Sequence, residues 1–313
     1  DLPLARRERT GKIVDHAAGR NRYVGYLISL ASHSYKDLKI GLDCANGASW
    51  SIAKSVFDAL GAQTFVIGNT PDGLNVNKDC GSTHIENLQA LVKEKNLDVG
   101  FAFDGDADRC IAVDENGKVV DGDGILYVLG NRLKAKGTLD KNKIAVTVMS
   151  NTGLFRALED AGIGYEITAV GDRFVYEKME EEGLRLGGEQ SGHIIIRKYA
   201  TTGDGLLTAI MLTEELRDKK LTLSKLSEPV VLFPQITKNV RVTDKNAAIN
   251  DEMLLKKCEE INAELGRNGR AVLRASGTEP VLRIMLECES KEKCEKYIST
   301  LYSIVKKRGY CCE

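Results

Sequence analysis

Residues 101–109 read Phe101-Ala102-Phe103-Asp104-Gly105-Asp106-Ala107-Asp108-Arg109, so a short apolar segment runs directly into three aspartates. Side chains at positions i, i+2 and i+4 fall on one side of an extended backbone, and we therefore expect the three carboxylates to converge. Anions this close repel one another, and a hard cation relieves that repulsion. Carboxylate oxygens suit Mg²⁺, Mn²⁺ or Ca²⁺ and not a soft metal. The pattern predicts a metal loop made by Asp104, Asp106 and Asp108.

Other kinds of protein also carry aspartates at this spacing. An EF-hand needs Gly at its sixth loop position, where this chain has Arg109, and it needs helices where strands are expected here. A haloacid-dehalogenase-type phosphatase would use Asp104 as nucleophile and Asp106 as acid. Such enzymes want Thr or Val at the place of Asp108, so this alternative is the weaker one. A solvated acidic turn without a ligand is the plainest alternative.

Length and composition exclude several classes of protein. The 313 residues suffice for two or three domains. With 44 basic and 45 acidic residues the formal net charge is −1, so no overall field attracts nucleic acid or an anionic membrane. The eight cysteines contain no CxxC pair and are too few for a disulfide scaffold. No apolar run reaches 18 residues, and we expect a reduced, cytoplasmic protein with neither a nucleic-acid nor a membrane partner.

Apolar periodicity predicts alternating strands and helices up to residue 234. The predicted strands are 38–44, 64–67, 99–103, 110–113, 143–149 and 165–170. The predicted helices are 22–30, 53–60, 84–95, 123–136, 152–161, 172–182 and 204–217. Ser150 or Asn151 is expected to cap the helix that begins at residue 152, and Ser82 or Thr83 the helix that begins at 84. Residues 218–235 contain two prolines and are expected to form a linker.

The pattern changes after residue 235 to strand, helix, strand, strand, helix. These elements are predicted at 236–242, 246–265, 270–274, 281–287 and 291–307. The fold class is therefore α/β, with two tandem α/β/α domains whose sheets are mixed and largely parallel, followed by a smaller α+β C-terminal domain. The expected divisions are 1–18, the tail of a preceding domain; 19–120, with the metal loop; 121–234; and 235–313. In such sheets ligands bind at the carboxyl ends of the strands, where the metal loop is expected.

A second candidate site is the stretch Arg274-Ala275-Ser276-Gly277-Thr278-Glu279-Pro280. Gly277 allows a turn whose N–H groups point inward, Ser276 and Thr278 add hydroxyls, and Arg274 can hold two phosphate oxygens. Arg283 on the following strand could reach the same pocket. An ordinary hairpin turn would have a similar composition. Because a metal loop of the phosphate-handling type lies upstream, we favour an anion-binding loop.

A third candidate site is the polar loop that contains Glu189, Ser191 and His193. These residues alternate with Gln190 and Gly192, so their side chains share a face if the backbone is extended. A carboxylate accepts hydrogen bonds from hydroxyls, and Ser and His donate or accept, which suits recognition of a sugar. The alternative is a Glu and a His that only satisfy the backbone of their loop.

Several stretches together resemble the alpha-D-phosphohexomutase superfamily, and within it the phosphoglucosamine mutase branch. Besides the metal and phosphate loops, they are Asp43-Cys44-Ala45-Asn46-Gly47-Ala48, Asp72-Gly73-Leu74-Asn75-Val76-Asn77, Cys80-Gly81-Ser82-Thr83-His84, Val170-Gly171-Asp172-Arg173 and Gly188-Glu189-Gln190-Ser191-Gly192-His193. They follow the order of the family along nearly the whole chain. The phosphomannomutase/phosphoglucomutase branch has Glu-Met-Ser-Ala-His in the sugar loop, so Gln190 and Gly192 favour glucosamine.

The resemblance implies a role for each candidate residue. Mg²⁺ would be held by Asp104, Asp106 and Asp108, with Arg109 assisting catalysis beside them. Glu189 and Ser191 would bind sugar hydroxyls. The non-reacting phosphate of the substrate would be held by Arg274, Ser276, Gly277 and Thr278. In such enzymes a phosphoserine donates its phosphoryl group to the sugar, a 1,6-bisphosphate reorients, and the serine takes back the other phosphoryl group, which interconverts glucosamine 6-phosphate and glucosamine 1-phosphate.

The resemblance also implies that part of the enzyme is absent from these 313 residues. Family members have four domains, and the chain resembles the second, third and fourth. Ala31-Ser32-His33 resembles part of the phosphoserine loop, but Ser34 and Tyr35 follow where the family has Asn and Pro, and we do not assign Ser32 as the nucleophile. We expect the chain alone to lack mutase turnover. The expected partners are a hexosamine phosphate substrate and the N-terminal domain of the same protein, with a homodimer as a further option.

Three alternatives stay open. A phosphomannomutase/phosphoglucomutase of the same superfamily differs only in sugar preference. A phosphatase would use Asp104 as its nucleophile. A non-catalytic module would bind sugar phosphate and stay inactive even with the first domain restored.

Overall fold

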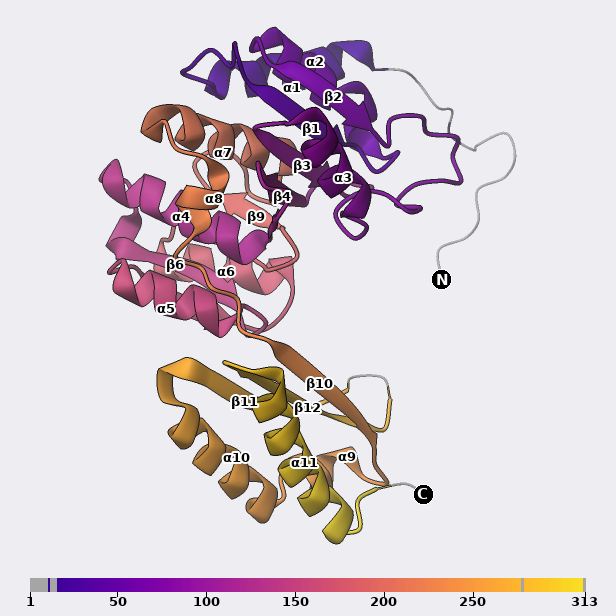
Figure 1. The fold of residues 1–313 in the computed structure, drawn as a ribbon, viewed down its shortest axis with the longest axis vertical. Coiled ribbons are helices and arrows are strands. Elements are labelled where there is room, and N and C mark those ends of the chain that lie inside the picture. Colours follow the sequence, from indigo (N-terminus) through magenta and orange to yellow (C-terminus); the bar gives the residue numbers. More distant parts are fainter. Residues whose placement is uncertain (1–10, 12–15, 277–278, 312–313) are drawn as a thin grey trace.

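The computed structural model of the chain describes residues 11, 16–276 and 279–311 and contains three sheets (Figure 1). Two α/β units are followed by a smaller C-terminal unit with an antiparallel sheet, which confirms the predicted fold class. Gly277 and Thr278, predicted to bind phosphate, lie outside the described residues. Among the residues described, no helix has the length and apolar character needed to cross a bilayer.

The first unit is built around a five-stranded sheet with the strand order β2-β1-β3-β4-β5. Its elements are α1 (Ala17–Leu30), β1 (Lys39–Asp43), a 3₁₀ turn (Ala48–Ser51), α2 (Ala53–Ala59), β2 (Gln63–Ile67), α3 (Glu86–Lys95), β3 (Val99–Phe103), β4 (Cys110–Asp114) and β5 (Val119–Val120). β1 pairs in parallel with β2 and β3, whereas β4 returns antiparallel to β3. All five residues of β3 are buried, as its unbroken apolar run predicts for a central strand.

The second unit has a four-stranded sheet with the order β7-β6-β8-β9. Its elements are α4 (Gly122–Ala135), a 3₁₀ turn (Asp140–Asn142), β6 (Lys143–Thr147), α5 (Thr152–Asp160), β7 (Gly164–Thr168), α6 (Asp172–Glu182), β8 (Leu186–Gly188), β9 (Ile194–Ile196), α7 (Gly205–Lys219) and α8 (Leu223–Ser227). Asn151 caps α5 as predicted, through its side chain and the N–H of Gly153. The predicted linker is wrong in part, because α8 forms within it and buries Leu223 completely.

The C-terminal unit has three antiparallel strands in the order β10-β12-β11. Its elements are β10 (Gln235–Arg241), α9 (Lys245–Ile249), α10 (Glu252–Leu265), a 3₁₀ turn (Gly266–Asn268), β11 (Gly269–Ala275), β12 (Val281–Cys288) and α11 (Lys291–Lys307). The single helix expected over 246–265 is wrong. The chain breaks at Asn250, and the Asp251 carboxylate caps α10 by accepting a hydrogen bond from the N–H of Leu254 (3.1 Å).

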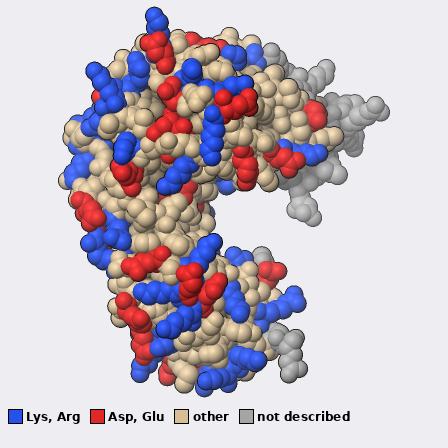
Figure 2. All heavy atoms as spheres, in the orientation of Figure 1, with Lys and Arg blue, Asp and Glu red and all other residues tan. Residues whose placement is uncertain are grey.

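Apolar packing joins the first two units but not the third. One continuous cluster of buried side chains includes Phe101 of the first unit and Leu126 and Leu207 of the second. The C-terminal unit has its own cluster, in which Leu286 of β12 packs with Leu301 of α11. The chain therefore consists of a larger two-unit body and a smaller unit joined to it, with a hollow between them (Figure 2).

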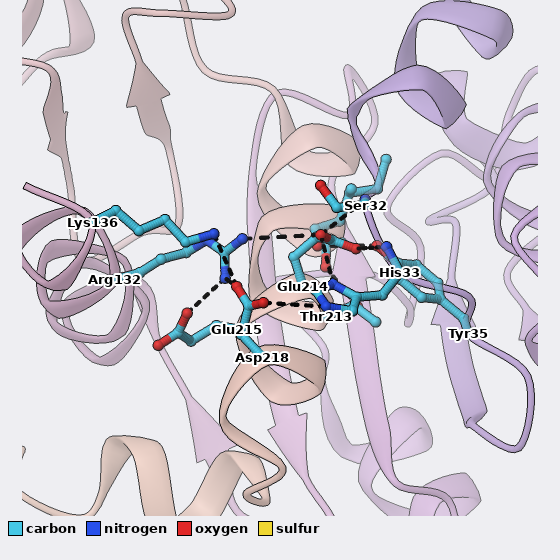
Figure 3. Close-up of polar contacts among 11 residues, drawn as sticks. Ser32, His33, Tyr35, Arg132, Lys136, Thr213, Glu214, Glu215 and Asp218 are labelled. Atoms are coloured by element: carbon cyan, nitrogen blue, oxygen red, sulfur yellow. Dashed lines mark hydrogen bonds and ion pairs between the residues drawn. The ribbon is translucent and has the colours of Figure 1, made fainter. Parts of the chain in front are cut away.

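A buried polar cluster also joins the first two units (Figure 3). The Glu214 carboxylate accepts hydrogen bonds from the N–H groups of Ser32 (3.0 Å) and His33 (3.2 Å). The two ring nitrogens of His33 lie 3.1 Å from Glu214 and 3.3 Å from Asp218. The Arg132 guanidinium then pairs with Asp218 at 2.5 Å. The segment that resembled part of a phosphoserine loop is therefore held against α7 by carboxylates.

Candidate functional site

The aspartate loop joins β3 to β4 and forms a turn instead of an extended segment. The N–H of Ala107 donates to the carbonyl of Asp104 (3.0 Å), and Ala107 has a left-handed backbone with φ of 62°. An L-residue rarely adopts this conformation, so the loop stores strain of the kind common at binding sites. The expected alternation of side chains is therefore wrong. Asp104 and Asp108 are half-buried, whereas Asp106 is exposed.

The carboxylates of this loop lie close together, and their proximity changes the pKa of Asp104. Burial raises the pKa of the Asp104 carboxyl, and the neighbouring Asp108 raises it further. The Oδ1 atom of Asp108 is buried without a hydrogen-bond partner. The Arg109 Nε lies 3.9 Å from Asp104 Oδ2, beyond hydrogen-bond distance. Two crowded carboxylates with a free buried oxygen fit a hard cation in donor chemistry. Among the described residues, however, no three His, Cys, Asp or Glu side chains form a group that could hold a metal.

The loop of residues 189–193 in the second unit pairs with the aspartate loop through its backbone. Arg109 and His193 form an antiparallel bridge, and the N–H of Cys110 donates to the carbonyl of Gly192 (3.0 Å). The N–H of Gly205, at the start of α7, donates to the carbonyl of Ala107 (2.9 Å). The two loops predicted from separate motifs therefore form one site between the first two sheets.

His193 connects the two loops through its side chain. Its Nδ1 lies 3.1 Å from Asp108 Oδ2, and its Nε2 accepts a hydrogen bond from the N–H of Gly203 (2.9 Å). Because Nε2 is the acceptor, the proton of the neutral ring is on Nδ1 and points to Asp108. The side chain is only 4% exposed. His193 therefore contacts the aspartate loop and has little surface to offer a sugar.

Glu189 and Ser191 do not share a face with His193. The N–H of Gly192 donates to the carbonyl of Glu189 (3.0 Å), and Gly192 has φ of 93°, so the loop turns where an extended segment was expected. Ser191 is exposed and Glu189 is half-buried. Glu189 Oε1 accepts a hydrogen bond from the N–H of Gly171 (3.0 Å), which brings the start of α6 beside it. Sequence reasoning quoted this Gly171-Asp172-Arg173 motif without giving it a place in the site.

The C-terminal unit brings two of the predicted phosphate ligands together. Arg274 of β11 and Arg283 of β12 lie directly opposite each other in the antiparallel register, so their side chains leave the same face. Two cations in this position repel each other, and a bound anion would relieve the repulsion. Ser276 is buried, and its hydroxyl accepts a hydrogen bond from the N–H of Glu279 at 3.4 Å.

Sequence reasoning gave no role to the three carboxylates that are completely buried in the described residues. Asp43 ends β1 and accepts hydrogen bonds from the N–H groups of Ala45 (3.0 Å) and Gly81 (2.8 Å). Asp123 and Glu287 are both completely buried near the start of α5. For Asp43 the signal was a charged residue at the end of an apolar strand. Asp123 and Glu287 gave no local signal, because both depend on contacts between distant segments.

Comparison with known proteins identifies the class to which this fold and site belong. Residues 21–117, 121–232 and 238–302 match the models of phosphoglucomutase/phosphomannomutase alpha/beta/alpha domain II, alpha/beta/alpha domain III and the C-terminal domain. A phosphoglucomutase/phosphomannomutase family protein from Burkholderia thailandensis superposes with a TM-score of 0.75 at 24% identity, covering 93% of this chain and 65% of that one. An Aspergillus fumigatus N-acetylphosphoglucosamine mutase, solved with GlcNAc-6P and magnesium, gives 0.73 at 18% identity, covering 93% of this chain and 65% of that one. The similarity to these two structures establishes the fold of this chain.

Curated relatives narrow the class further. The phosphoglucosamine mutase of Lachnospira eligens is 55% identical over 99% of this chain and 69% of its own length. The enzyme of that name from Lachnoclostridium phytofermentans is 50% identical over the same shares. The chain belongs to the phosphoglucosamine mutase family of the alpha-D-phosphohexomutases, whose members are isomerases. It spans about two thirds of the length of the proteins to which it is similar.

Proposed function

We propose that this chain supplies the metal, sugar and distal-phosphate sites of an enzyme that interconverts glucosamine 6-phosphate and glucosamine 1-phosphate. The observation that carries the proposal is the pairing of the aspartate loop with the 189–193 loop, through the Arg109–His193 bridge and the Asp108–His193 contact. It joins a carboxylate set suited to a cation and a loop suited to a sugar in a single site. The reaction itself is inferred from the family to which the chain belongs.

The residues divide into three roles in this proposal. Asp104, Asp106 and Asp108 would hold Mg²⁺, which neutralises charge on a phosphoryl group in transfer. Arg109 adds a positive charge beside the same oxygens. Glu189 and the exposed Ser191 face sugar hydroxyls, and His193 fixes the carboxylate of Asp108. In the C-terminal unit Arg274, Ser276 and Arg283, with Gly277 and Thr278, hold the phosphate that does not react.

Phosphoryl transfer requires a donor that these 313 residues do not contain. In the proposed reaction a phosphoserine gives its phosphoryl group to the free hydroxyl of the sugar phosphate, which leaves serine and a 1,6-bisphosphate. After the bisphosphate turns around in the site, the serine oxygen takes the other phosphoryl group, which releases the product and restores the phosphoserine. The partner that carries this serine is the family's N-terminal domain. A homodimer is a further partner in this proposal.

The same proposal includes the division of the chain and its location. Bounds at 19–120, 121–234 and 235–313 are supported by the three matched ranges and by the separate core of the C-terminal unit. A cytoplasmic location is supported by seven cysteines that are free in the described residues, as in a reducing compartment.

Complementation tests the function. The chain is mixed with, or fused behind, the N-terminal part of the Lachnospira eligens relative, loaded with Mg²⁺ and glucose 1,6-bisphosphate, and supplied with glucosamine 6-phosphate. We expect glucosamine 1-phosphate only when both parts are present, and none when Asp104, Asp106 and Asp108 are replaced by Asn. Glucose and mannose phosphates in competition measure the sugar preference.

Two other results would replace this function. Release of inorganic phosphate by the chain alone, with beryllium fluoride inhibition that depends on Asp104, would make it a phosphatase. Ligand binding without turnover in the complemented enzyme would make it a binding module.

A further inference from the structure

On one face of the three-stranded sheet, β11 and β12 together carry four charged residues at regular spacing. Alternation along β11 puts Arg270 and Arg274 on this face, and alternation along β12 does the same for Arg283 and Glu287. The register pairs Arg270 with Glu287 and Arg274 with Arg283. The opposite face packs into the core of the C-terminal unit. Since each strand residue advances about 3.4 Å, the two pairs, four residues apart, are separated by roughly 14 Å along the strands.

The Arg270–Glu287 pair contacts the second unit at the start of α5. Glu287 Oε1 accepts hydrogen bonds from the N–H of Thr152 (2.5 Å) and from the Thr152 hydroxyl. Arg270 donates through Nη2 to the carbonyl of Ser150 (2.5 Å), and its Nε lies 3.4 Å from Glu287 Oε1. A carboxylate suits this place because the N-terminus of a helix carries a partial positive charge. One end of the charged ladder is therefore fixed to the body of the second unit.

The residue between Ser150 and Thr152 holds the chain that connects the two units. Asn151 accepts from the N–H of Phe233 (2.9 Å) and donates to its carbonyl (3.0 Å). At the next position a side chain on Gly153 would meet the carbonyl oxygen of Val231 at 2.0 Å, so this connection approaches α5 as closely as glycine permits. The start of α5 therefore fixes both the connecting chain and the sheet of the C-terminal unit.

The buried carboxylate of Glu287 is better explained by a role in orienting the C-terminal unit than by a contribution to stability. Glu287 is completely buried, yet its Oε2 has no hydrogen-bond partner. Two other buried oxygens at the start of α5, Ser150 Oγ and Asp123 Oδ1, are also without a partner. Burying a charged group in this way costs free energy that apolar side chains of similar size would not. A directional contact that sets the angle between the two bodies would explain why such a group is present despite this cost.

We propose that Glu287 is a positioning residue for the substrate phosphate. By docking on Thr152, it sets the angle of the C-terminal unit, and with it the positions of Arg274, whose Nη1 lies 3.1 Å from Met149 Sδ of the second unit, and of Arg283 opposite it; a hollow separates the two bodies (Figure 2). The inference rests on the proposed function, because it assumes that one sugar phosphate spans both loops. Inorganic phosphate needs only the arginines, whereas a sugar phosphate also needs the distance between the loops.

The test compares these two ligands on the 313-residue chain with Mg²⁺ present. Isothermal titration measures the Kd of glucosamine 6-phosphate and, separately, of inorganic phosphate for the wild type and for Glu287→Leu, Glu287→Gln and Glu289→Leu. For Glu287→Leu we expect the sugar phosphate to bind at least about tenfold more weakly, because small misplacements of a binding group have effects of this size. Inorganic phosphate should bind as before. Glu287→Gln keeps an oxygen for Thr152 and should restore most of the affinity. Glu289→Leu, on an exposed carboxylate nearby, should change neither value.

Three results would overturn the inference. The first is unchanged sugar-phosphate affinity in Glu287→Leu. The second is an equal loss for both ligands, which would mean that the variant damages the phosphate loop itself. The third is a wild-type chain that binds inorganic phosphate but not glucosamine 6-phosphate. That result would contradict the proposed function, on which the inference rests. Small-angle scattering then tests docking alone: Glu287→Leu should increase the radius of gyration, and an unchanged radius would refute the docking role.

Discussion

The chain contains two junctions of opposite character. Between the first two units a continuous apolar core is reinforced by Glu214 of α7, which accepts from the N–H groups of Ser32 and His33; within the second unit Arg132, with a side chain only 9% exposed, lies beside the same carboxylates (Figure 3). Between the second and C-terminal units the cores are separate, and polar contacts lie along α5, at its start (Glu287 and Arg270) and near its end, where Arg267 pairs with Glu159 and Asp160. The first junction is a shared apolar core, and the second is a small set of directional contacts.

The difference between the two junctions matches the groups that each one keeps in place. The aspartate loop and the 189–193 loop touch through backbone hydrogen bonds, so any movement between their units would break the site. In the proposed function the arginines of the C-terminal unit hold the phosphate that does not react, and the polar contacts with α5, which we call the polar hinge, would let this unit open for exchange of ligand and close again. The two-unit body and the C-terminal unit should therefore unfold in separate transitions.

The largest expected effect is on the stability of the two-unit body. Arg132→Ala leaves the buried carboxylates of Glu214 and Glu215 without this cation, and removing one partner of a buried ion pair costs about 3–5 kcal/mol. Urea unfolding followed by circular dichroism should show the two-unit transition weakened by that amount and the C-terminal transition unchanged. The control is Lys136→Ala, which removes a half-exposed partner of Asp218 and should cost at most about 1 kcal/mol. Equal losses in both variants would contradict a buried role for Arg132.

The reverse experiment weakens the C-terminal unit alone. Leu301 is completely buried in the separate core, and Leu301→Ala should lower the stability of that unit by about 2–5 kcal/mol through the lost burial and the cavity. The two-unit transition should keep its midpoint in the same urea titration. A single shared transition that moves as a whole would show that the two bodies fold as one.

A smaller effect is expected within the site of the first junction. His193→Ala removes the group that fixes Asp108, and losses of this kind typically weaken metal binding by about 10–100-fold. Isothermal titration of Mg²⁺ against the chain measures this. His193→Asn keeps an N–H near the Nδ1 position and should recover part of the affinity. Ser191→Ala, on the exposed part of the same loop, should leave the Mg²⁺ affinity unchanged, and an equal loss there would argue against a specific role for His193.

The two junctions also differ in how much of them the sequence predicted. The unbroken apolar run of β3 and the aspartates after it predicted both the central strand and the place of the site, because each signal is local. The side-chain directions within the loop were wrong, because the left-handed turn at Ala107 depends on packing against Gly205 of the second unit. The expected cap by Ser82 or Thr83 was also wrong: α3 begins later, at Glu86, without a side-chain cap.

The polar hinge gave almost no signal in the sequence. Glu287 lies in a strand that reads as ordinary β-structure, and its partner Thr152 is 135 residues away. The break at Asn250 and the helix α8 inside the predicted linker were missed for related reasons, since short helices are stabilised mainly by what they pack against. The arginines at 274 and 283 were predicted from the motif, but only the register shows that they lie directly opposite each other.

The smallest expected effect is a change in how stability depends on pH. It arises at the start of α5, where the second unit contacts the C-terminal unit. Burial raises the pKa of Asp123, whose carboxylate accepts from the N–H of Asn151 (2.6 Å), to about 7, with Asp121 and Glu287 adding to the shift. Between pH 4 and 7 the folded chain then keeps a proton that the unfolded chain has lost, so stability falls as pH rises, by at most about 1.4 kcal/mol per pH unit. Asp123→Asn cannot titrate and should flatten this part of the profile in urea unfolding between pH 4 and 8. Asp79→Asn, on an exposed carboxylate with a left-handed backbone that Asn tolerates, should keep the wild-type slope. If Asp123→Asn retained that slope, the pH dependence would arise elsewhere and the raised pKa of Asp123 would be contradicted.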